Sequence, residues 1–270
     1  MKNVYMVTVF LTMAMLSIAG AQEAPEGFVL IAPGSFVMGS PDESLPNESQ
    51  HTVHITRGFY MQATEVTQAE YELVMGENPS AFKESRLPVE MVSWYDAVRY
   101  CNKRSEKEGL QPCYRINETE VSCDWNANGY RLPTESEWEY ACRAGTTERF
   151  FTGNCLSADD ANYNGKNPLS GCDKGKYRGK TWPAGSGKAN AWGLYDMSGN
   201  VWEWCWDRYG DYPAGSVSDP TGADSGSDHL LRGGCWARGA KNCRSAARYM
   251  ASRKLQRNFL GFRLVRAAGR

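Results

Sequence analysis

Two long stretches rich in Gly, Asn, Asp and Ser, at residues 153–200 and 207–228, constrain the fold of this chain more than any other feature. Connections of this length are uncommon in a compact domain unless they are functional or are stabilised by a metal. The chain is nevertheless not disordered, because 41% of its 270 residues are hydrophobic and 12% are aromatic, which is enough to bury a substantial core. We therefore expect a globular domain with few regular elements and long, structured loops.

Short helices and strands are expected between these loops. Three helix starts carry a capping pair, in which a hydroxyl residue is followed three positions later by an acidic residue, and a glycine further on can stop each helix. These residues are Thr67, Glu70 and Gly76; Ser93, Asp96 and Gly109; and Thr134, Glu137 and Gly145. Strand-like patterns occupy residues 28–31, 201–206 and 260–265. The helices and strands are predicted to pack into one core.

The first 21 residues have the pattern of a signal peptide. Lys2 supplies a positive charge, residues 4–18 form an apolar run, and small residues at 19–21 suit cleavage before Gln22. The run is shorter than the roughly 20 residues that span a bilayer and no comparable run follows, so we predict no transmembrane segment. We expect a bacterial protein that is secreted or displayed at the cell surface, with residues 22–270 as a single domain.

Nine cysteines are spread along the chain, which suits an oxidising compartment. No Cys-x-x-Cys pair occurs, so disulfides are favoured over metal binding. Cys113 and Cys123 flank a short segment with strand-like ends and are expected to staple a hairpin. Cys155 and Cys172 bracket a polar loop in a similar way. The odd count leaves at least one thiol unpaired within each molecule.

Several function classes lack support in the sequence. Thirty basic and thirty-one acidic residues give a net charge of -1, with no basic stripe for nucleic acid. There is no Gly-x-Ser-x-Gly elbow, no phosphate-binding glycine loop and no His-Glu-x-x-His motif. His51 and His54 lie three positions apart in a strand-like segment, so their side chains are expected on opposite faces and do not suit one metal.

Seven ordered motifs resemble those of the formylglycine-generating enzyme, or sulfatase-modifying factor, family. They are GSFVMGS at 34–40, EVT at 65–67, PVEMVSW at 88–94, YRLPTESEWEYA at 130–141, GLYDMSGNVWEW at 193–204, LRGG at 231–234 and GFRLVR at 261–266. These motifs cover nearly the whole chain after the signal peptide. The resemblance implies an α+β, C-type-lectin-like fold of the loop-rich kind that this family has.

The family's enzyme binds copper through two cysteines that lie four and nine residues beyond the Arg-Gly-Gly motif. Counting from Gly234 places Arg238 at the first position and Cys243 at the second, so the pair is incomplete. One thiolate cannot form the two-sulfur site that Cu(I) needs, and we expect neither copper nor enzyme activity. In the family, the cysteine matching Cys142 is bonded to one near Cys243. The resemblance therefore implies a Cys142–Cys243 disulfide.

The resemblance also implies a structural calcium ion. Asn200 and Glu203 match residues that hold calcium in the family together with backbone carbonyls, and hard oxygen ligands of this kind suit the ion. Asn162 resembles part of a second calcium site, with Asp173 as a loosely aligned partner. A turn at Asn200 and a surface carboxylate at Glu203 would explain the same residues without a metal.

The segment 235–259 resembles the variable regions of proteins that retroelements diversify, in which a reverse transcriptase randomises adenines within a C-type-lectin-like domain. Asn codons can then become Ala, Arg, Gly, Ser, Cys, Tyr, Leu or Phe, and residues of these types recur here without helical or strand periodicity. The candidate variable, ligand-binding positions are Cys235, Ala237, Arg238, Gly239, Ala247, Tyr249, Ala251, Ser252, Leu255, Asn258 and Phe259. The expected fixed frame is Trp236, Cys243, Arg244, Ser245 and Arg248. Variation at buried positions would create clashes or cavities, so the variable residues are expected on an exposed face.

These observations favour an exported binding protein whose C-terminal segment is diversified. Its partner is expected to be a variable ligand, a protein on host or neighbouring cells, because Arg238 and Tyr249 are of types that dominate protein interfaces. Two alternatives stay open: a metal-dependent oxidase or sulfatase-maturation factor, and an undiversified binding module. A carbohydrate-binding lectin is suggested by the fold name alone, since neither Glu-Pro-Asn nor Gln-Pro-Asp occurs.

Overall fold

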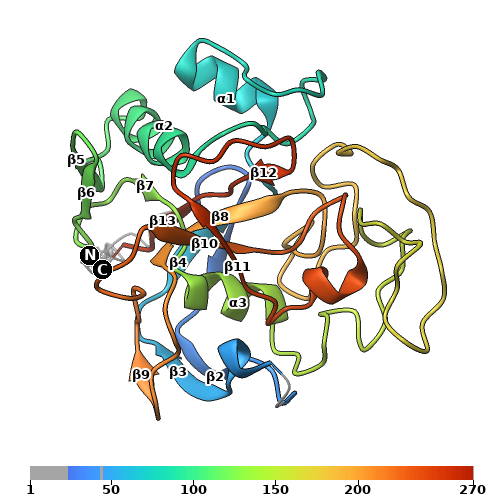
Figure 1. Cartoon of the computed structure of the whole chain (residues 1–270). Helices are drawn as coiled ribbons and strands as arrows, with labels where there is room; N and C mark the ends of the chain where they lie inside the picture. The colour runs from blue at the N-terminus through green and yellow to red at the C-terminus, as the bar shows by residue number, and fades with distance from the viewer. Residues whose placement is uncertain (1–23, 43–44, 270) are drawn as a thin grey trace, which may run out of the picture.

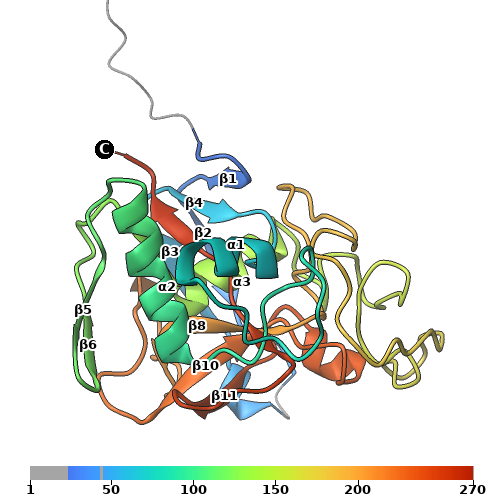
Figure 2. The ribbon, with the colours of Figure 1, turned by 90° about the horizontal axis from the view of Figure 1, so that it is seen from above.

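The computed structural model describes residues 24–42 and 45–269, so the predicted signal peptide lies outside the described residues. Three helices and thirteen short strands are joined by long loops in this part of the chain (Figure 1). The loops between residues 146 and 200 gather on one side, away from helix α2 (Trp94–Lys107) (Figure 1, Figure 2). No helix within the described ranges is long and apolar enough to cross a membrane.

Each helix begins at the capping pair that the sequence predicts. The helices α1 (Gln68–Met75), α2 and α3 (Glu135–Arg143) follow Thr67, Ser93 and Thr134. Each of these hydroxyls accepts a hydrogen bond from the backbone N–H of the acidic residue three positions later. The carboxylate of that acidic residue in turn accepts a hydrogen bond from the backbone N–H of the hydroxyl residue. These reciprocal bonds satisfy backbone groups that have no partner inside the helix. The three helix predictions are therefore confirmed.

Four small sheets complete the fold. The first has the order β1 (Phe28–Ile31), β4 (Phe59–Gln62), β13 (Val265–Ala267) and β7 (Tyr130–Arg131). The second has the order β11 (Tyr249–Ser252), β10 (Asp228–Arg232), β8 (Trp202–Arg208) and β12 (Leu260–Gly261). The third contains β2 (Gly34–Met38), β3 (His51–Ile55) and β9 (Val217–Ser218), and the fourth is the hairpin β5 (Tyr114–Asn117) and β6 (Glu120–Cys123). Two 3-10 turns, η1 (Pro46–Glu48) and η2 (Ala240–Cys243), interrupt the loops.

The strand predictions hold for two segments and need correction for the third. Residues 28–31 form β1, and 201–206 fall largely within β8. The stretch 260–265 is instead divided, because Leu260 and Gly261 pair with β8 whereas Val265 pairs with β4 and β7. Phe262 and Leu264, between the two short strands, are fully buried. The chain thus crosses from the second sheet to the first through the core.

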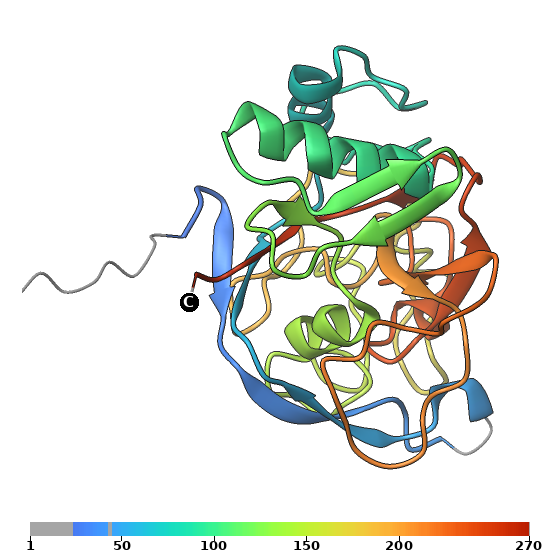
Figure 3. The same ribbon diagram turned by 90° about the vertical axis from the view of Figure 1, so that its left-hand side faces the viewer.

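Buried tryptophans fix two helices on strand β8. Trp94 of α2 and Trp204 of β8 are almost fully buried, and their indole N–H groups donate to backbone carbonyls of Cys205 and Val92 at 3.0 and 3.1 Å. Each ring therefore adds apolar contact without an unpaired donor. Trp138 of α3 is also fully buried. Figure 3 shows α3 at the centre of the domain, between the first and second sheets.

Candidate ligand-binding face

The predicted variable segment runs along the second sheet. It leaves β10, turns through η2, returns as β11 and reaches β12 (Figure 1). Strand β11 pairs antiparallel with β10, with Tyr249 opposite Leu231 and Ser252 opposite Asp228. β11 is an edge strand of this sheet, so no other described strand pairs with its outer side. The segment therefore combines a backbone held by the sheet with an uncovered edge.

Arg232 fixes the backbone of this segment from inside the domain. Its side chain is fully buried and donates to the carbonyl oxygens of residues 245–247 at 2.8 to 3.0 Å. Arg232 also bonds Glu139 of α3. Burial alone would raise the pKa of Glu139, but the charges of Arg232 and Arg143 hold that pKa below its ordinary value. The buried ion pair stays charged and ties the segment to α3.

Two arginines of the predicted frame are anchored in the same way. Arg244 forms two hydrogen bonds with Glu48, at 2.7 and 2.8 Å, and Arg248 forms two with Glu135, at 2.7 and 3.0 Å. All four side chains are at least nine-tenths buried. Two bonds between a guanidinium and a carboxylate fix orientation as well as position. These pairs join the segment to η1 and to the start of α3.

Trp236 holds the first part of the segment in place. Its indole N–H donates to the carbonyl of Asn258 at 3.0 Å, which links the two ends of the segment. The ring meets the edge of Phe82 with the centroids 5.7 Å apart and stacks on Tyr177 at 6.3 Å. The backbone N–H of Ser245, another frame residue, donates to the carbonyl of Arg149 at 2.8 Å. The residues expected to be fixed thus have defined partners.

The candidate variable positions divide into an exposed and a buried group. We define the binding face as the members that are exposed or partly exposed: Ala237, Arg238, Tyr249, Ser252, Leu255, Asn258 and Phe259. Cys235, Ala247 and Ala251 are only 0%, 4% and 7% exposed. A Cβ atom at Gly239 would lie 2.8 Å from the carbonyl oxygen of Asn167. Larger side chains at these four positions would clash with their neighbours, which corrects the expectation that all the candidates lie on an exposed face.

Two exposed side chains beside the binding face were missed by the sequence reasoning. Met250 follows Tyr249 on β11 and is 44% exposed, and Tyr177 is 40% exposed where it stacks on Trp236. Methionine is not among the residues that a mutated Asn codon provides, and Tyr177 lies far away in the sequence. Neither residue carried a signal before the fold was known.

The two positions that the resemblance assigns to copper do not supply two sulfur ligands. Arg238 is exposed, whereas the Cys243 thiol is fully buried and donates towards the carbonyl of Gly239 at 3.9 Å. Burial raises the pKa of Cys243, and it raises the pKa of the nearby Cys235 to about 12. Because Arg238 carries no sulfur, the two positions supply one thiol rather than the pair of sulfur ligands that Cu(I) needs. These residues do not fit Cu(I).

The disulfide implied between Cys142 and Cys243 is not formed. Both residues are free thiols, and Cys142 donates to the carbonyl of Met197 and to Ser245 Oγ, each at 3.6 Å. The 3-10 turn η2 directs the Cys243 sulfur to the carbonyl of Gly239 instead. Ser245 therefore occupies the position facing Cys142, and the implied pairing is wrong for this structure.

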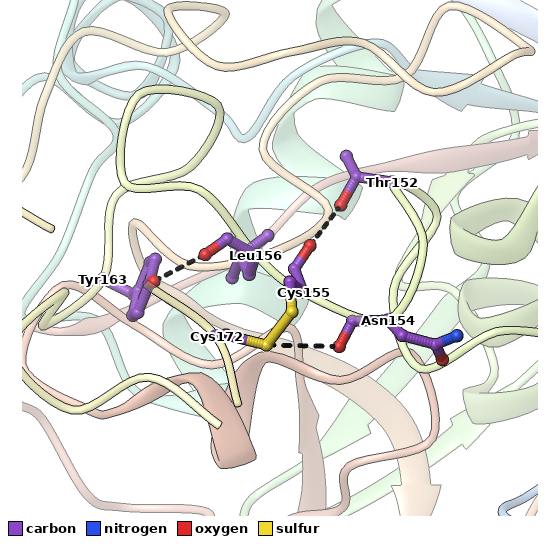
Figure 4. Close-up of a disulfide and its surroundings, with 6 residues drawn as sticks. All are labelled: Thr152, Asn154, Cys155, Leu156, Tyr163 and Cys172. Atoms are coloured by element: carbon purple, nitrogen blue, oxygen red, sulfur yellow. Dashed lines mark hydrogen bonds between the residues drawn. A yellow bond between two sulfur atoms is a disulfide. The ribbon is translucent and has the colours of Figure 1, made fainter. Parts of the chain in front are cut away.

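The predicted disulfide between Cys155 and Cys172 is confirmed. It joins residues 17 positions apart within the long polar loop (Figure 4). Next to it, the Tyr163 hydroxyl donates to the carbonyl of Leu156 at 2.7 Å, and the Thr152 hydroxyl donates to that of Cys155 (Figure 4). The loop is thus cross-linked covalently and by hydrogen bonds.

The hairpin expected around Cys113 and Cys123 forms, but its disulfide does not. Both cysteines are free thiols. The register places Cys123 opposite Tyr114, one residue away from Cys113. The thiol of Cys113 donates instead to the carbonyl of Gly129 at 3.3 Å. The register of β5 and β6, which the spacing of the cysteines does not reveal, explains the error.

Asn200 lies at the centre of a fully buried polar cluster. Its Oδ1 accepts the side-chain N–H of Asn162 at 3.1 Å and the backbone N–H of Trp182 at 3.0 Å. Its Nδ2 donates to Glu65 Oε1 at 3.0 Å. The structure therefore brings together two of the predicted calcium ligands, Asn162 and Asn200, with Glu65 beside them.

The other two predicted calcium ligands form no hydrogen bond with Asn200, Asn162 or Glu65 within the described residues. The carboxylate of Glu203 accepts two bonds from Arg263, at 2.7 and 2.8 Å, and one from the indole of Trp138 at 2.7 Å. Both of its oxygens are thus engaged. Asp173 is exposed, and no hydrogen bond joins it to Asn162 or Asn200 within the described ranges. The hydrogen bond between Asn162 and Asn200 thus joins residues that were expected at two different calcium sites, whereas no hydrogen bond among the described residues joins either expected pair, Asn200 with Glu203 or Asn162 with Asp173.

Glu65, the first residue of the EVT motif at 65–67, is a further member of this cluster, for which the sequence predicts no role. Its Oε2 and the Oδ1 of Asn162 are buried without a hydrogen-bond partner. Burial, and then the charges of Asp196 and Glu203, raise the pKa of Glu65 well above its ordinary value. No group of three or more His, Cys, Asp or Glu side chains suited to a metal occurs among the residues described. The cluster offers a mixture of carboxylate and amide oxygens instead.

The fold and these contacts define a loop-rich, C-type-lectin-like domain of the formylglycine-generating-enzyme type, with the candidate binding face beside its second sheet. The chain belongs to the family described as sulfatase-modifying factor enzyme 1-like domain, which matches residues 16–268. The fold class expected from the seven motifs is thereby confirmed.

Proteins with different names are similar to this chain. It is 39% identical to chaperone protein LppX of Paenibacillus barcinonensis, over 71% of this chain and 75% of that one. It is 30% identical to the formylglycine-generating enzyme of Mus musculus, over 87% of this chain and 73% of the enzyme. The solved structure of Treponema denticola variable protein 1 matches with a TM-score of 0.79 and 33% identity, covering 89% of this chain and 94% of that one. Enzymes and proteins named for other roles thus share this domain.

Proposed function

We propose that this protein is an exported ligand-binding protein whose binding face is diversified by a retroelement. The proposal rests on one observation: residues 235–259 divide into buried residues that fix the backbone and side chains that reach solvent. Buried arginines and Trp236 fix the backbone, while the seven side chains of the binding face reach solvent at least in part. Replacing those seven would change the surface without leaving a buried charge unpaired.

Two similarities support a variable face with a protein ligand. Treponema denticola variable protein 1 is named for variation and shares the fold over nearly its whole length. A chaperone, which LppX is called, acts on proteins. Arg238 and Tyr249 add a long cation and an aromatic ring, which are the side chains that anchor protein interfaces, and the exposed Met250 directly follows Tyr249 on β11.

The DNA beside the gene tests diversification. We expect a near copy of the sequence coding for residues 235–259 next to a reverse transcriptase gene, with Asn codons at binding-face positions such as Arg238 and Tyr249. The codons for Arg244 and Arg248 should be the same in both copies. If no copy exists, or if the differences fall on these arginines, the segment is an undiversified binding module.

An oxidase or sulfatase-maturation factor is the competing function, because the chain is 30% identical to the formylglycine-generating enzyme of Mus musculus. We infer that this activity is absent, since Arg238 stands at one copper position and the Cys243 thiol at the other is buried. Incubation with Cu(I), oxygen and a Cys-containing sulfatase peptide should leave the mass of the peptide unchanged. Copper-dependent conversion of its cysteine would contradict this inference.

We also propose that calcium stabilises the cluster around Asn200. The unpartnered oxygens of Glu65 and Asn162, with the buried carboxylate of Asp196 nearby, are hard ligands that the ion would satisfy. The protein should unfold at a higher temperature with calcium chloride than with EDTA, and Glu65→Gln should remove most of that difference. Equal unfolding temperatures in the two buffers would exclude the site. Magnesium chloride serves as the control for ionic strength.

A further inference from the structure

A second candidate binding site lies on the same sheet, outside the binding face. A cavity of about 180 Å³ opens between β8, β10, the turn after β6 and the loop 221–224. It is smaller than the roughly 300–1,000 Å³ of pockets that hold drug-sized ligands. Arg253 at its rim directly follows Ser252 of the binding face, but no binding-face residue lines the cavity. Its volume suits a single ring with its substituents.

Indole rings form one wall of this cavity. Trp206 stacks on Tyr114 with the rings 12° from parallel and the centroids 5.2 Å apart. Trp125 stands at 88° to Trp206 and is 36% exposed. The guanidinium of Arg131 lies 5.1 Å from the centroid of the Trp125 ring and helps to fix it. A large aromatic ring that is held rigid and left open to solvent is available to a ligand.

Polar groups of both kinds form the rest of the lining. Arg208 donates to the backbone carbonyl of Asp224 at 2.7 Å, which holds the loop 221–224 against β8. The carboxylate of Asp224 is an acceptor on an exposed residue at the rim. Arg253 provides further N–H donors, because a guanidinium has five, of which one donates to the carbonyl of Thr119 while Nη2 lies 4.0 Å from the carboxylate of Glu120. Hydrogen-bond donors and acceptors therefore both line this small cavity.

His229 lines the cavity as a neutral imidazole. Its Nδ1 lies 2.8 Å from the carbonyl oxygen of Trp206, and because a carbonyl can only accept, Nδ1 carries the proton. Burial lowers the pKa of His229 to about 4, so the ring is neutral at physiological pH. Nε2 is then the acceptor nitrogen of the ring.

We propose that this cavity binds one pyranose ring of a glycan. The carboxylate of Asp224 disfavours a free anion, which requires hydrogen-bond donors alone. The positive charges of Arg208 and Arg253 disfavour a quaternary ammonium ion, which requires a cage of aromatic rings. Sugar hydroxyls both donate and accept, which matches the mixed lining. The C–H groups on one face of a pyranose match the negative face of an exposed indole such as Trp125. The site does not depend on the proposed diversification, because its walls lie outside the binding face.

Methyl glycosides of glucose, galactose, mannose and N-acetylglucosamine test this proposal directly. The mature protein is titrated with each one and followed by saturation-transfer NMR and tryptophan fluorescence. At least one glycoside should bind saturably with a dissociation constant of about 1 mM, the strength that a single small ring can provide. Tetramethylammonium chloride and sodium acetate, titrated in parallel, should not bind at this site.

Two variants and one control locate the binding. Trp125→Ala and Asp224→Asn should each weaken the glycoside at least tenfold, and Asp224→Asn removes only a charge at an exposed position, so it should fold normally. Tyr249→Ala, which removes an exposed aromatic ring from the binding face, should leave the affinity unchanged. The proposal is overturned if no glycoside binds or if neither cavity variant weakens it. Binding of tetramethylammonium that Trp125→Ala abolishes would overturn it in favour of a cation site.

Discussion

Buried arginines, rather than the apolar residues around them, set the path of the C-terminal segment. Arg232, Arg244 and Arg248 each meet a carboxylate from a distant part of the chain. Such pairs add little net stability compared with an apolar core, but they permit only one arrangement of the segment. Their removal should therefore be far more damaging than changes to the binding face.

Arg248→Ala is predicted to destabilise the fold by about 3 kcal/mol, because the buried carboxylate of Glu135 loses its bidentate partner and keeps only Arg232 at 3.5 Å and the Tyr212 hydroxyl at 3.2 Å. Urea denaturation followed by tryptophan fluorescence measures this change. Arg238→Ala is the matched control, since Arg238 is exposed and lies in the same segment. Equal destabilisation by the two substitutions would mean that the frame and the face are not distinct.

His229 should make stability depend on pH below neutrality. Burial lowers its pKa to about 4 in the folded protein, whereas an unfolded histidine titrates near 6.5. The unfolded state therefore takes up the proton first as the pH falls. Stability should be complete above about pH 6.5 and fall between that value and about pH 4, by on the order of 3 kcal/mol.

The measurement compares the free energy of unfolding at pH 7.5 and pH 4.5 for the wild-type protein and for His229→Asn. Carboxylates that titrate in the same range contribute equally to both proteins. The difference between the two pH dependences therefore isolates His229. If the two proteins lose the same stability on acidification, the histidine is not held neutral by its surroundings.

Among the elements, the 150–172 loop depends on one covalent link. Replacing both Cys155 and Cys172 with serine should destabilise the protein by about 3 kcal/mol, because the bond closes a loop between residues 17 positions apart. Cys123→Ser, at a residue that is a free thiol, is the control. A reducing agent should lower the unfolding temperature of the wild-type protein but not that of the double variant. A wild-type protein that is insensitive to reduction would contradict this expectation.

Local patterns predicted the elements well, whereas long-range pairings could not be read from the sequence. Capping pairs such as Thr67 with Glu70 act within one helical turn, so the sequence around them is sufficient to place a helix start. The partner of Cys142 depends on how η2 turns Cys243, which is decided far away in the chain. Glu65 likewise meets Asn200 across 135 positions. Residue types alone do not determine such contacts.

For the binding face, the sequence predicted the segment but not which of its residues reach solvent. Ala251 and Ser252 are neighbours of similar size, yet only Ser252 is exposed, and strand alternation does not account for this, because Tyr249 and Met250 are consecutive and both exposed. The strand could not be predicted beforehand, because the segment has no regular hydrophobic period. The cavity beside it was also missed, since its walls come from six separate parts of the chain, between Trp94 and Arg253.

At the scale of the whole molecule, the second sheet has one side that packs on a helix and an edge strand that reaches solvent. Its inner side packs on α2 through Trp94 and Trp204, whereas its edge strand β11 carries part of the binding face. The buried arginines that hold the segment are therefore distinct from the binding face, although Leu255 and Phe259 of that face also pack against the main core. A scaffold arranged in this way should tolerate several changes on its face at once.

The triple variant in which Arg238, Tyr249 and Ser252 are all replaced by alanine should unfold within about 4 °C of the wild-type protein, because exposed side chains contribute little to stability. By contrast, the single substitution Ala251→Tyr should lower the unfolding temperature far more, since Ala251 is 7% exposed and packs against the main core. Differential scanning calorimetry measures both changes. If the triple variant unfolds as early as Ala251→Tyr, the face contributes to the fold itself, and free variation of its side chains would not be compatible with a stable protein.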